Sequence, residues 1–149
     1  MIVETHVTIN GSRAAIWATI IDIRNAAKII KGIEQIEILE TPATGLVGLR
    51  WRETRMYFGK PAAVEKRITD AVENESYKTR AESDGFVFTS TLHIAEDGTG
   101  GLTLTSSHET RPQGIAATLK SLPMIFFKGI VKKALLQDLN DIKSTVEKK

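Results

Sequence analysis

Apolar and polar side chains alternate along the first segment of the chain. From Ile2 to Ile9, every second residue starting at Val3 falls on one face, and Glu4 and His6 fall on the other. This two-residue period predicts a half-buried β-strand.

Two short helices are expected after this strand. Asn10-Gly11 indicates a turn, and Ser12 is a suitable N-cap for a helix that runs to about Ile21. A second helix is expected from about residue 24 to residue 31, and Gly32 is well placed to end it in a left-handed conformation.

The two-residue period returns at Ile33 and continues to about Arg111. Gly, Asn and Asp residues break this region into short segments, which indicates hairpins and therefore an antiparallel meander. The six strands predicted here are residues 36–39, 47–58, 63–71, 77–83, 86–95 and 102–110.

The last part of the chain changes to a helical period. Between Pro123 and about Val146 the apolar positions recur every three or four residues, and lysines and aspartates, including Asp138, mostly fall on the opposite side. A helix of ~24 residues is ~36 Å long, and only the concave face of the sheet is large enough to cover its apolar side. No linker, repeat or low-complexity segment interrupts the sequence, so residues 1–149 are expected to form one α+β domain.

Composition narrows the range of functions. The chain has 149 residues, with 20 lysines and arginines against 18 aspartates and glutamates spread along its length, so no basic face for nucleic acid is expected. The sequence contains no cysteine, which excludes disulfides, thiolate metal ligands and a thiolate nucleophile. We expect a cytoplasmic protein, a monomer or homodimer without stable membrane association, because neither a signal sequence nor a membrane-length apolar run is found.

Three stretches of sequence resemble a known superfamily. They are residues 48–59 (GLRWRETRMYFG), residues 83–91 (SDGFVFTST) and residues 133–143 (KALLQDLNDIK) of the final helix. Together with the order of elements, they resemble the polyketide cyclase/dehydrase-like branch of the START-like (SRPBCC) superfamily. The resemblance implies a helix-grip fold, in which a curved seven-stranded antiparallel sheet wraps around a long C-terminal helix. It also implies an internal cavity for a small hydrophobic ligand, but it implies no single chemistry.

Side-chain parity along the strands indicates which residues line that cavity. The large apolar side chains select the inward face, and a few polar side chains share it. The predicted ligand-binding residues are Leu49, Trp51, Glu53, Arg55, Tyr57, Phe86, Phe88, Ser90, Leu92 and Leu104 from the strands, with Phe127 and Val131 from the helix. A β-bulge in any of these strands would reverse the assignment.

Glu53, Arg55 and His108 are the weak catalytic candidates. Glu53 and Arg55 are close enough for an ion pair, in which Arg55 binds an anionic or carbonyl group of a ligand or the pair is purely structural. His108 is the one histidine on an inferred inward face and is either a general base or a rim residue, whereas His6 and His93 are expected on the surface. No histidine pair has a metal-ligand spacing, so neither a metal nor an organic cofactor is expected.

Three classes of function are compatible with this sequence. The favoured one is binding of a small hydrophobic or aromatic metabolite, because no acid/base constellation stands out. The alternatives are a cyclase/dehydratase-type enzyme acting on a polyketide-like substrate and a protein-interaction or quinone-binding accessory module.

Overall fold

The computed structural model describes residues 1–57, 59–114 and 128–148. Its first elements are β1 (Ile2–Ile9), α1 (Arg13–Ile20), the short 3-10 helix η1 (Ile23–Asn25) and α2 (Ala26–Ile29). The remaining elements are β2 (Ile33–Glu40), β3 (Arg50–Tyr57), β4 (Lys60–Val72), β5 (Ser76–Ser83), β6 (Phe86–Glu96), β7 (Leu102–Pro112) and α4 (Lys128–Glu147).

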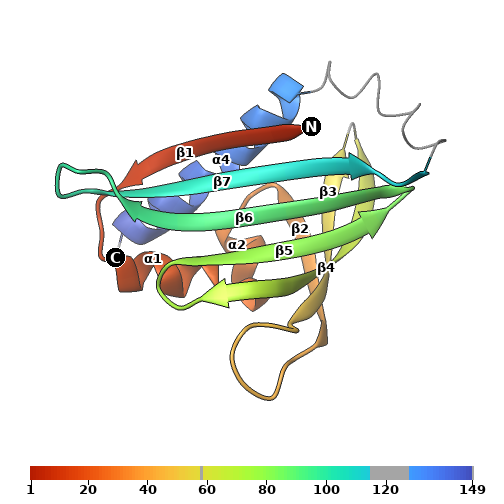
Figure 1. The fold of residues 1–149 in the computed structure, drawn as a ribbon, viewed down its shortest axis with the longest axis horizontal. Coiled ribbons are helices and arrows are strands. Elements are labelled where there is room, and N and C mark those ends of the chain that lie inside the picture. Colours follow the sequence, from red (N-terminus) through yellow and green to blue (C-terminus); the bar gives the residue numbers. More distant parts are fainter. Residues whose placement is uncertain (58, 115–127, 149) are drawn as a thin grey trace.

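All seven strands form one antiparallel sheet in the order β1-β7-β6-β5-β4-β3-β2. The predicted meander from β2 to β7 is therefore confirmed. β1 forms one edge of the sheet and pairs with β7 rather than with β2. The sheet curves, and α4 crosses behind it on the same side as α1 and α2 (Figure 1). The α+β architecture with a long C-terminal helix on the concave face agrees with the expectation from the sequence.

The two halves of α4 are held very differently. Its C-terminal half carries the buried residues Leu139, Ile142 and Val146, which pack with β1 and α1. This half is also tied to the start of the chain, because Glu147 accepts a hydrogen bond of 2.8 Å from the backbone N–H of Asn10. Its N-terminal half is much more open, and Ile130 is 55% exposed.

The start of α1 is as the sequence predicts. The Ser12 hydroxyl accepts a hydrogen bond of 3.0 Å from the backbone N–H of Ala15, which satisfies one of the free donors at the helix end. From α1, Trp17 packs edge-on against Tyr77 of β5, and the Tyr77 hydroxyl donates to the backbone carbonyl of Ile20. These contacts fasten α1 to the concave face of the sheet.

Two local expectations were wrong. Val47 was expected in a strand, but β3 begins at Arg50, and Val47 lies in the preceding loop with 51% of its surface exposed. Gly32 was expected in a left-handed conformation, but it is not among the positive-φ glycines of the described residues. A side chain at Gly32 would instead meet Arg55, because a Cβ there would lie 3.1 Å from the guanidinium nitrogen Nη1. Close approach of Arg55, and not backbone conformation, is what favours glycine at this position.

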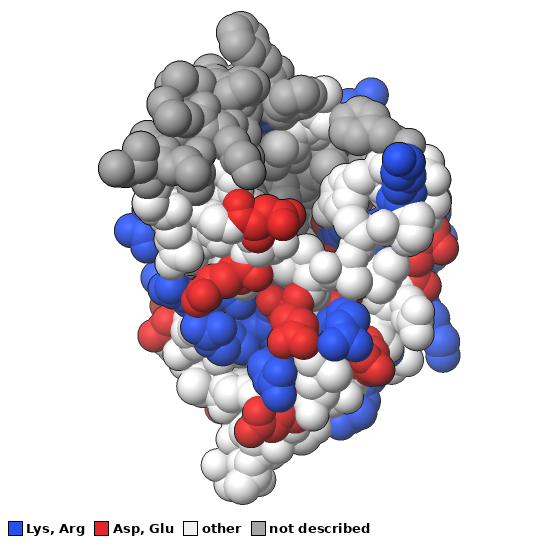
Figure 2. Space-filling model, turned by 90° about the vertical axis from the view of Figure 1, so that its right-hand side faces the viewer, with Lys and Arg blue, Asp and Glu red and all other residues white. Residues whose placement is uncertain are grey.

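Charged side chains on the outer face of the sheet form a network of surface ion pairs. Arg50 and Arg52 of β3 both contact Glu65 of β4, and each also contacts a glutamate of β2. Viewed from the end where β5 turns into β6, positive and negative side chains are interleaved on the molecular surface (Figure 2). None of the helices in the described parts of the chain combines the length and the apolar character needed to cross a bilayer.

Candidate functional site

Strand register decides which side chains meet on the inner face. Pairing is uninterrupted between β3 and β4, between β5 and β6, and between β6 and β7. The parity inferred for β3, β6 and β7 therefore holds along each of these strands. Pairing between β4 and β5 contains a bulge after Ile68. The extra residue lies in β4, so the side chains of β4 beyond Ile68 alternate with the opposite parity.

One transverse row of side chains crosses the middle of the inner face. Trp51 of β3 pairs with Lys66 of β4, and Lys66 pairs with Ala81 of β5. The row continues to Phe88 of β6 and ends at Thr110 of β7. A lysine thus stands between a tryptophan and an alanine in a row whose only other polar member is Thr110.

A second row lies beside the first. It runs from His108 of β7 through Ser90 of β6 and Thr79 of β5 to Ile68 of β4. Ser90 Oγ and His108 Nδ1 are 2.8 Å apart and hydrogen-bonded, and the His108 ring stacks on Phe88 with 5.9 Å between ring centroids. Within the described residues, no hydrogen-bond partner of His108 Nε2 is found.

Four charged side chains converge where β3 and β4 face α4. We call Glu53, Arg55, Lys66 and Asp138 the four-charge cluster. Glu53 Oε2 accepts hydrogen bonds from Arg55 Nε at 2.8 Å and from Lys66 Nζ at 2.9 Å. The outer edge of the Arg55 guanidinium donates to both Asp138 oxygens, at 3.2 and 2.8 Å. Glu53 and Arg55 form the predicted ion pair, and the cluster as a whole ties β3 and β4 to α4.

Burial and pairing set the protonation of this cluster. Burial opposes ionisation of Glu53, but Lys66 and Arg55 together outweigh it and lower the pKa of this carboxyl to about 2. Burial likewise works against the charge of Arg55, yet the Asp138 and Glu53 contacts raise its pKa. Burial raises the pKa of Asp138, although the bidentate contact with Arg55 opposes that shift. The cluster thus pairs two acidic side chains with two basic ones, and Glu53 is ionised at neutral pH.

His108 is held in its neutral form. Burial, with the positive charges of Lys66 and Arg55 as smaller contributions, lowers the pKa of His108 to about 4. At physiological pH the imidazole is therefore uncharged, and its Nδ1 is hydrogen-bonded to Ser90. Its other nitrogen, Nε2, can accept or donate one further hydrogen bond, depending on the tautomer.

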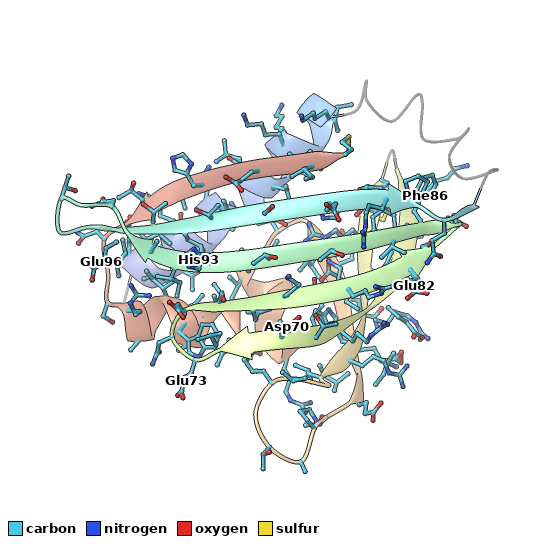
Figure 3. All side chains as sticks on the ribbon, viewed as in Figure 1. Asp70, Glu73, Glu82, Phe86, His93 and Glu96 are labelled. Atoms are coloured by element: carbon cyan, nitrogen blue, oxygen red, sulfur yellow. The ribbon has the colours of Figure 1, made fainter. Side chains whose placement is uncertain are left out.

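The predicted ligand-binding residues fall into several environments. Trp51, Glu53 and Phe86 are buried on the inner face, and Leu104 is completely buried within the core. Arg55, Phe88, Ser90, Leu92 and Val131 are half-buried, and Phe127 lies outside the described residues. Figure 3 shows Phe86 at the end of β6 nearest the end of β7, whereas His93 lies toward the other end of the same strand and is exposed. His6 is also exposed, as expected.

Two predicted lining residues lie at the margins. Tyr57 stands at the end of β3 with 52% of its surface exposed. Leu49 lines a separate hollow of about 250 Å³ between η1 and the loop before β3, together with Ile23 and Pro42. A second hollow, of about 490 Å³, lies beside the β6–β7 turn, away from the predicted lining.

Lys66 and Asp138 belong to the site geometry but were not among the candidates. The helical pattern placed Asp138 opposite the apolar stripe of α4, whereas the structure turns it toward Arg55 with 18% of its side chain exposed. A signal for Asp138 was present, because it lies three residues after Leu135 and four before Ile142, both on the apolar stripe. Lys66 shares the parity of Val64 and Ile68 on β4, which would have placed it on the inner face.

Comparison with known families supplies the assignment that this geometry alone does not give. The family model described as "Polyketide cyclase / dehydrase and lipid transport" matches residues 1–147. The chain belongs to this family. No match is found among curated proteins.

Several solved structures share the fold of this family member. A START superfamily protein from Mycobacterium smegmatis superposes with a TM-score of 0.80 at 16% identity, covering 99% of this chain and 97% of that one. The Zhui aromatase/cyclase from Streptomyces sp. R1128 gives a TM-score of 0.75 at 19% identity, with 99% and 93% covered. The di-domain aromatase/cyclase StfQ of the steffimycin biosynthetic pathway gives 0.78 at 9% identity, with 99% of this chain and 50% of that chain covered. At these identities the similarity establishes the START-like fold of the family member and not its activity.

Proposed function

We propose that this family member binds a small hydrophobic or aromatic molecule between the inner face of the sheet and α4. The observation that carries the proposal is the incomplete burial of Phe88, Ser90, Leu92 and His108, which point inward from the middle of β6 and β7. On the same strands, Ile94 and Leu104 are 1% and 0% exposed. Side chains that face the interior yet remain accessible indicate room for a further molecule beside them.

Apolar contact would supply most of the affinity. Burial of apolar surface contributes about 25 cal/mol per Å², and the rings of Phe88 and His108 offer a flat surface for an aromatic ligand. Ser90 and His108 would orient the ligand through a polar atom, since pockets of this kind combine an apolar lining with a few polar groups. The family description, which includes lipid transport, also fits a carrier of hydrophobic molecules.

Filling the inner face tests this proposal. Ser90→Phe places a ring where the ligand is expected, whereas Thr91→Phe places the same ring on the opposite face of the same strand. Titration with the neutral dye Nile red, followed by fluorescence, should show binding to the wild type and to Thr91→Phe, and at least about tenfold weaker binding to Ser90→Phe. Equal dye binding by both variants would contradict a site at Ser90.

A second candidate function is a cyclase/dehydratase-type enzyme acting on a polyketide-like chain. It is favoured by the neutral His108, whose Nε2 has no hydrogen-bond partner among the described residues and could remove a proton from the carbon between two ketone groups. The resulting enolate carbon would attack a second carbonyl of the same chain and form a carbon–carbon bond. The alkoxide oxygen would then be reprotonated by the imidazolium, and subsequent loss of water would give the cyclised product.

Product analysis separates this enzyme from a carrier. A synthetic poly-β-ketone thioester should give a cyclised, dehydrated product by mass spectrometry faster with the wild type than without protein. His108→Gln should remove that acceleration while still binding Nile red. The same product distribution with and without the wild type would leave binding as the function.

A further inference from the structure

Resting on the proposed binding function, we propose that the ligand is electrically neutral and that Asp138 sets this preference. Asp138 does so by occupying the outer edge of the Arg55 guanidinium. The proposed site thereby disfavours carboxylate and phosphate groups even though Arg55 and Lys66 lie beside it.

The contacts of the four-charge cluster carry this inference. Arg55 uses Nε for Glu53 and both terminal nitrogens for Asp138, so every side of its guanidinium has a carboxylate partner. Lys66 Nζ donates a hydrogen bond to Glu53. The positive charges of Arg55 and Lys66 are thus balanced by the carboxylates of Glu53 and Asp138. Neither cation is left over for the ligand.

These contacts make binding of an anionic ligand energetically unfavourable. It would either displace Asp138 or Glu53 from Arg55, or enter beside the cluster and leave the site with an uncompensated negative charge. Taking a carboxylate out of water is costly unless it is paired and hydrogen-bonded. A carbonyl, amide or hydroxyl group avoids that cost, because Ser90 and the neutral His108 can form hydrogen bonds with it.

Asp138 and Glu53 have different positions in the cluster. Glu53 is 8% exposed at its side chain and contacts both cations as well as Trp51 Nε1. Asp138 comes from α4, is 18% exposed at its side chain, and has Arg55 as its hydrogen-bond partner among the described residues. Removing the charge of Asp138 therefore frees the end of Arg55 while leaving the Glu53 contacts in place, and the cluster becomes positive.

A matched pair of ligands tests the inference. Naphthamide and naphthoate share one ring system and differ in charge. By isothermal titration calorimetry, the wild type should bind naphthamide at least about tenfold more tightly than naphthoate. In Asp138→Asn that ratio should fall at least about tenfold, because the freed guanidinium pairs with the carboxylate.

Two variants distinguish selectivity from a merely structural effect. Asp138→Glu keeps a carboxylate at this position and should restore the preference for naphthamide. Asp70→Asn removes the same charge from an exposed site on β4 and should leave the ratio unchanged (Figure 3). If Asp138→Asn does not fold, the double variant Arg55→Met with Asp138→Leu, whose remaining Glu53 and Lys66 balance, should keep the wild-type preference.

The outcomes separate this inference from the function on which it rests. Wild-type binding of naphthoate as tight as that of naphthamide would overturn the neutral-ligand inference and leave the binding function standing. An unchanged ratio in a folded Asp138→Asn variant would overturn the role of Asp138. Failure of both naphthalenes and of Nile red to bind would overturn the binding function, and the inference with it.

Discussion

The substitution Glu53→Gln tests the ionic origin of the cluster's stability. Glu53 is 8% exposed at its side chain and has its pKa lowered from 4.5 to about 2 by Lys66 and Arg55 acting against the cost of burial. That change in pKa corresponds to about 3 kcal/mol of free energy of unfolding at neutral pH. As pH falls, the Glu53 carboxylate is protonated in the unfolded chain, near pH 4.5, before it is protonated in the folded protein. The contribution is therefore complete above pH 4.5 and disappears as pH falls through about 2.

Urea unfolding at a series of pH values measures this contribution directly. Near neutral pH we expect Glu53→Gln to lower the free energy of unfolding by about 3 kcal/mol, since it leaves the half-buried Arg55 and Lys66 short of a carboxylate partner. The difference between wild type and variant should shrink steadily below pH 4.5. Asp138 contributes in the opposite direction in the wild type, because its pKa is raised, and Glu53→Gln also removes the repulsion from Glu53 that adds to this shift.

A surface glutamate provides the control. Glu65 contacts Arg50 and Arg52 on the outer face with 48% of its side chain exposed, so Glu65→Gln should cost less than about 1 kcal/mol. The reasoning would be refuted if the deficit of Glu53→Gln were the same at every pH, because the lost stability would then come from packing and not from charge.

Three further predictions concern single residues. The ring of His108 should titrate near pH 4 by NMR, and its contribution to stability, complete above pH 6.5, should be lost as pH falls through about 4; a midpoint near 6.5 would be inconsistent with the buried environment. Gly32→Ala should destabilise the fold by about 1 kcal/mol in thermal unfolding, because its Cβ crowds Arg55, and the cost should vanish in an Arg55→Met background; an equal cost in both backgrounds would point to another cause. Ser12→Ala should cost about 1 kcal/mol in urea unfolding through loss of the helix cap, whereas Ser144→Ala, at an exposed position of α4, should change little; similar values for both would argue against the cap.

The strands could be predicted from sequence because burial on one face imposes alternation. Turn residues such as Asp84-Gly85, both with positive φ, separate the strands sharply, and the expected boundaries of β5 and β6 lie within one residue of those observed. β2 and β4 were predicted too short: in β2 the buried Ile33 is followed by two exposed residues that break the alternation, and in β4 the first residues and Val72 are exposed. Pairing of β1 with β7 joins residues more than 90 positions apart, so no local pattern could indicate it.

The site was predicted in part. Parity along β3 brought Glu53 and Arg55 together, because neighbours two apart share a face of a strand. It could not reveal that Arg55 is shared with Asp138, since that contact spans 83 residues and depends on how far α4 stands from the sheet. The sequence left open whether Arg55 binds a ligand or forms a structural ion pair, and in the structure its guanidinium already pairs with two carboxylates.

Balanced charge in the cluster also restricts how this protein could evolve. A single substitution at Glu53, Arg55, Lys66 or Asp138 leaves a partly buried charge without its partner, so any change of ligand preference at these positions begins with a loss of stability. Paired replacements avoid that loss but need two mutations, one on β3 or β4 and often another on α4. We therefore expect divergence of ligand preference to begin at uncharged inner-face positions such as Ser90 and Thr79, where single substitutions alter shape without disturbing the charge balance.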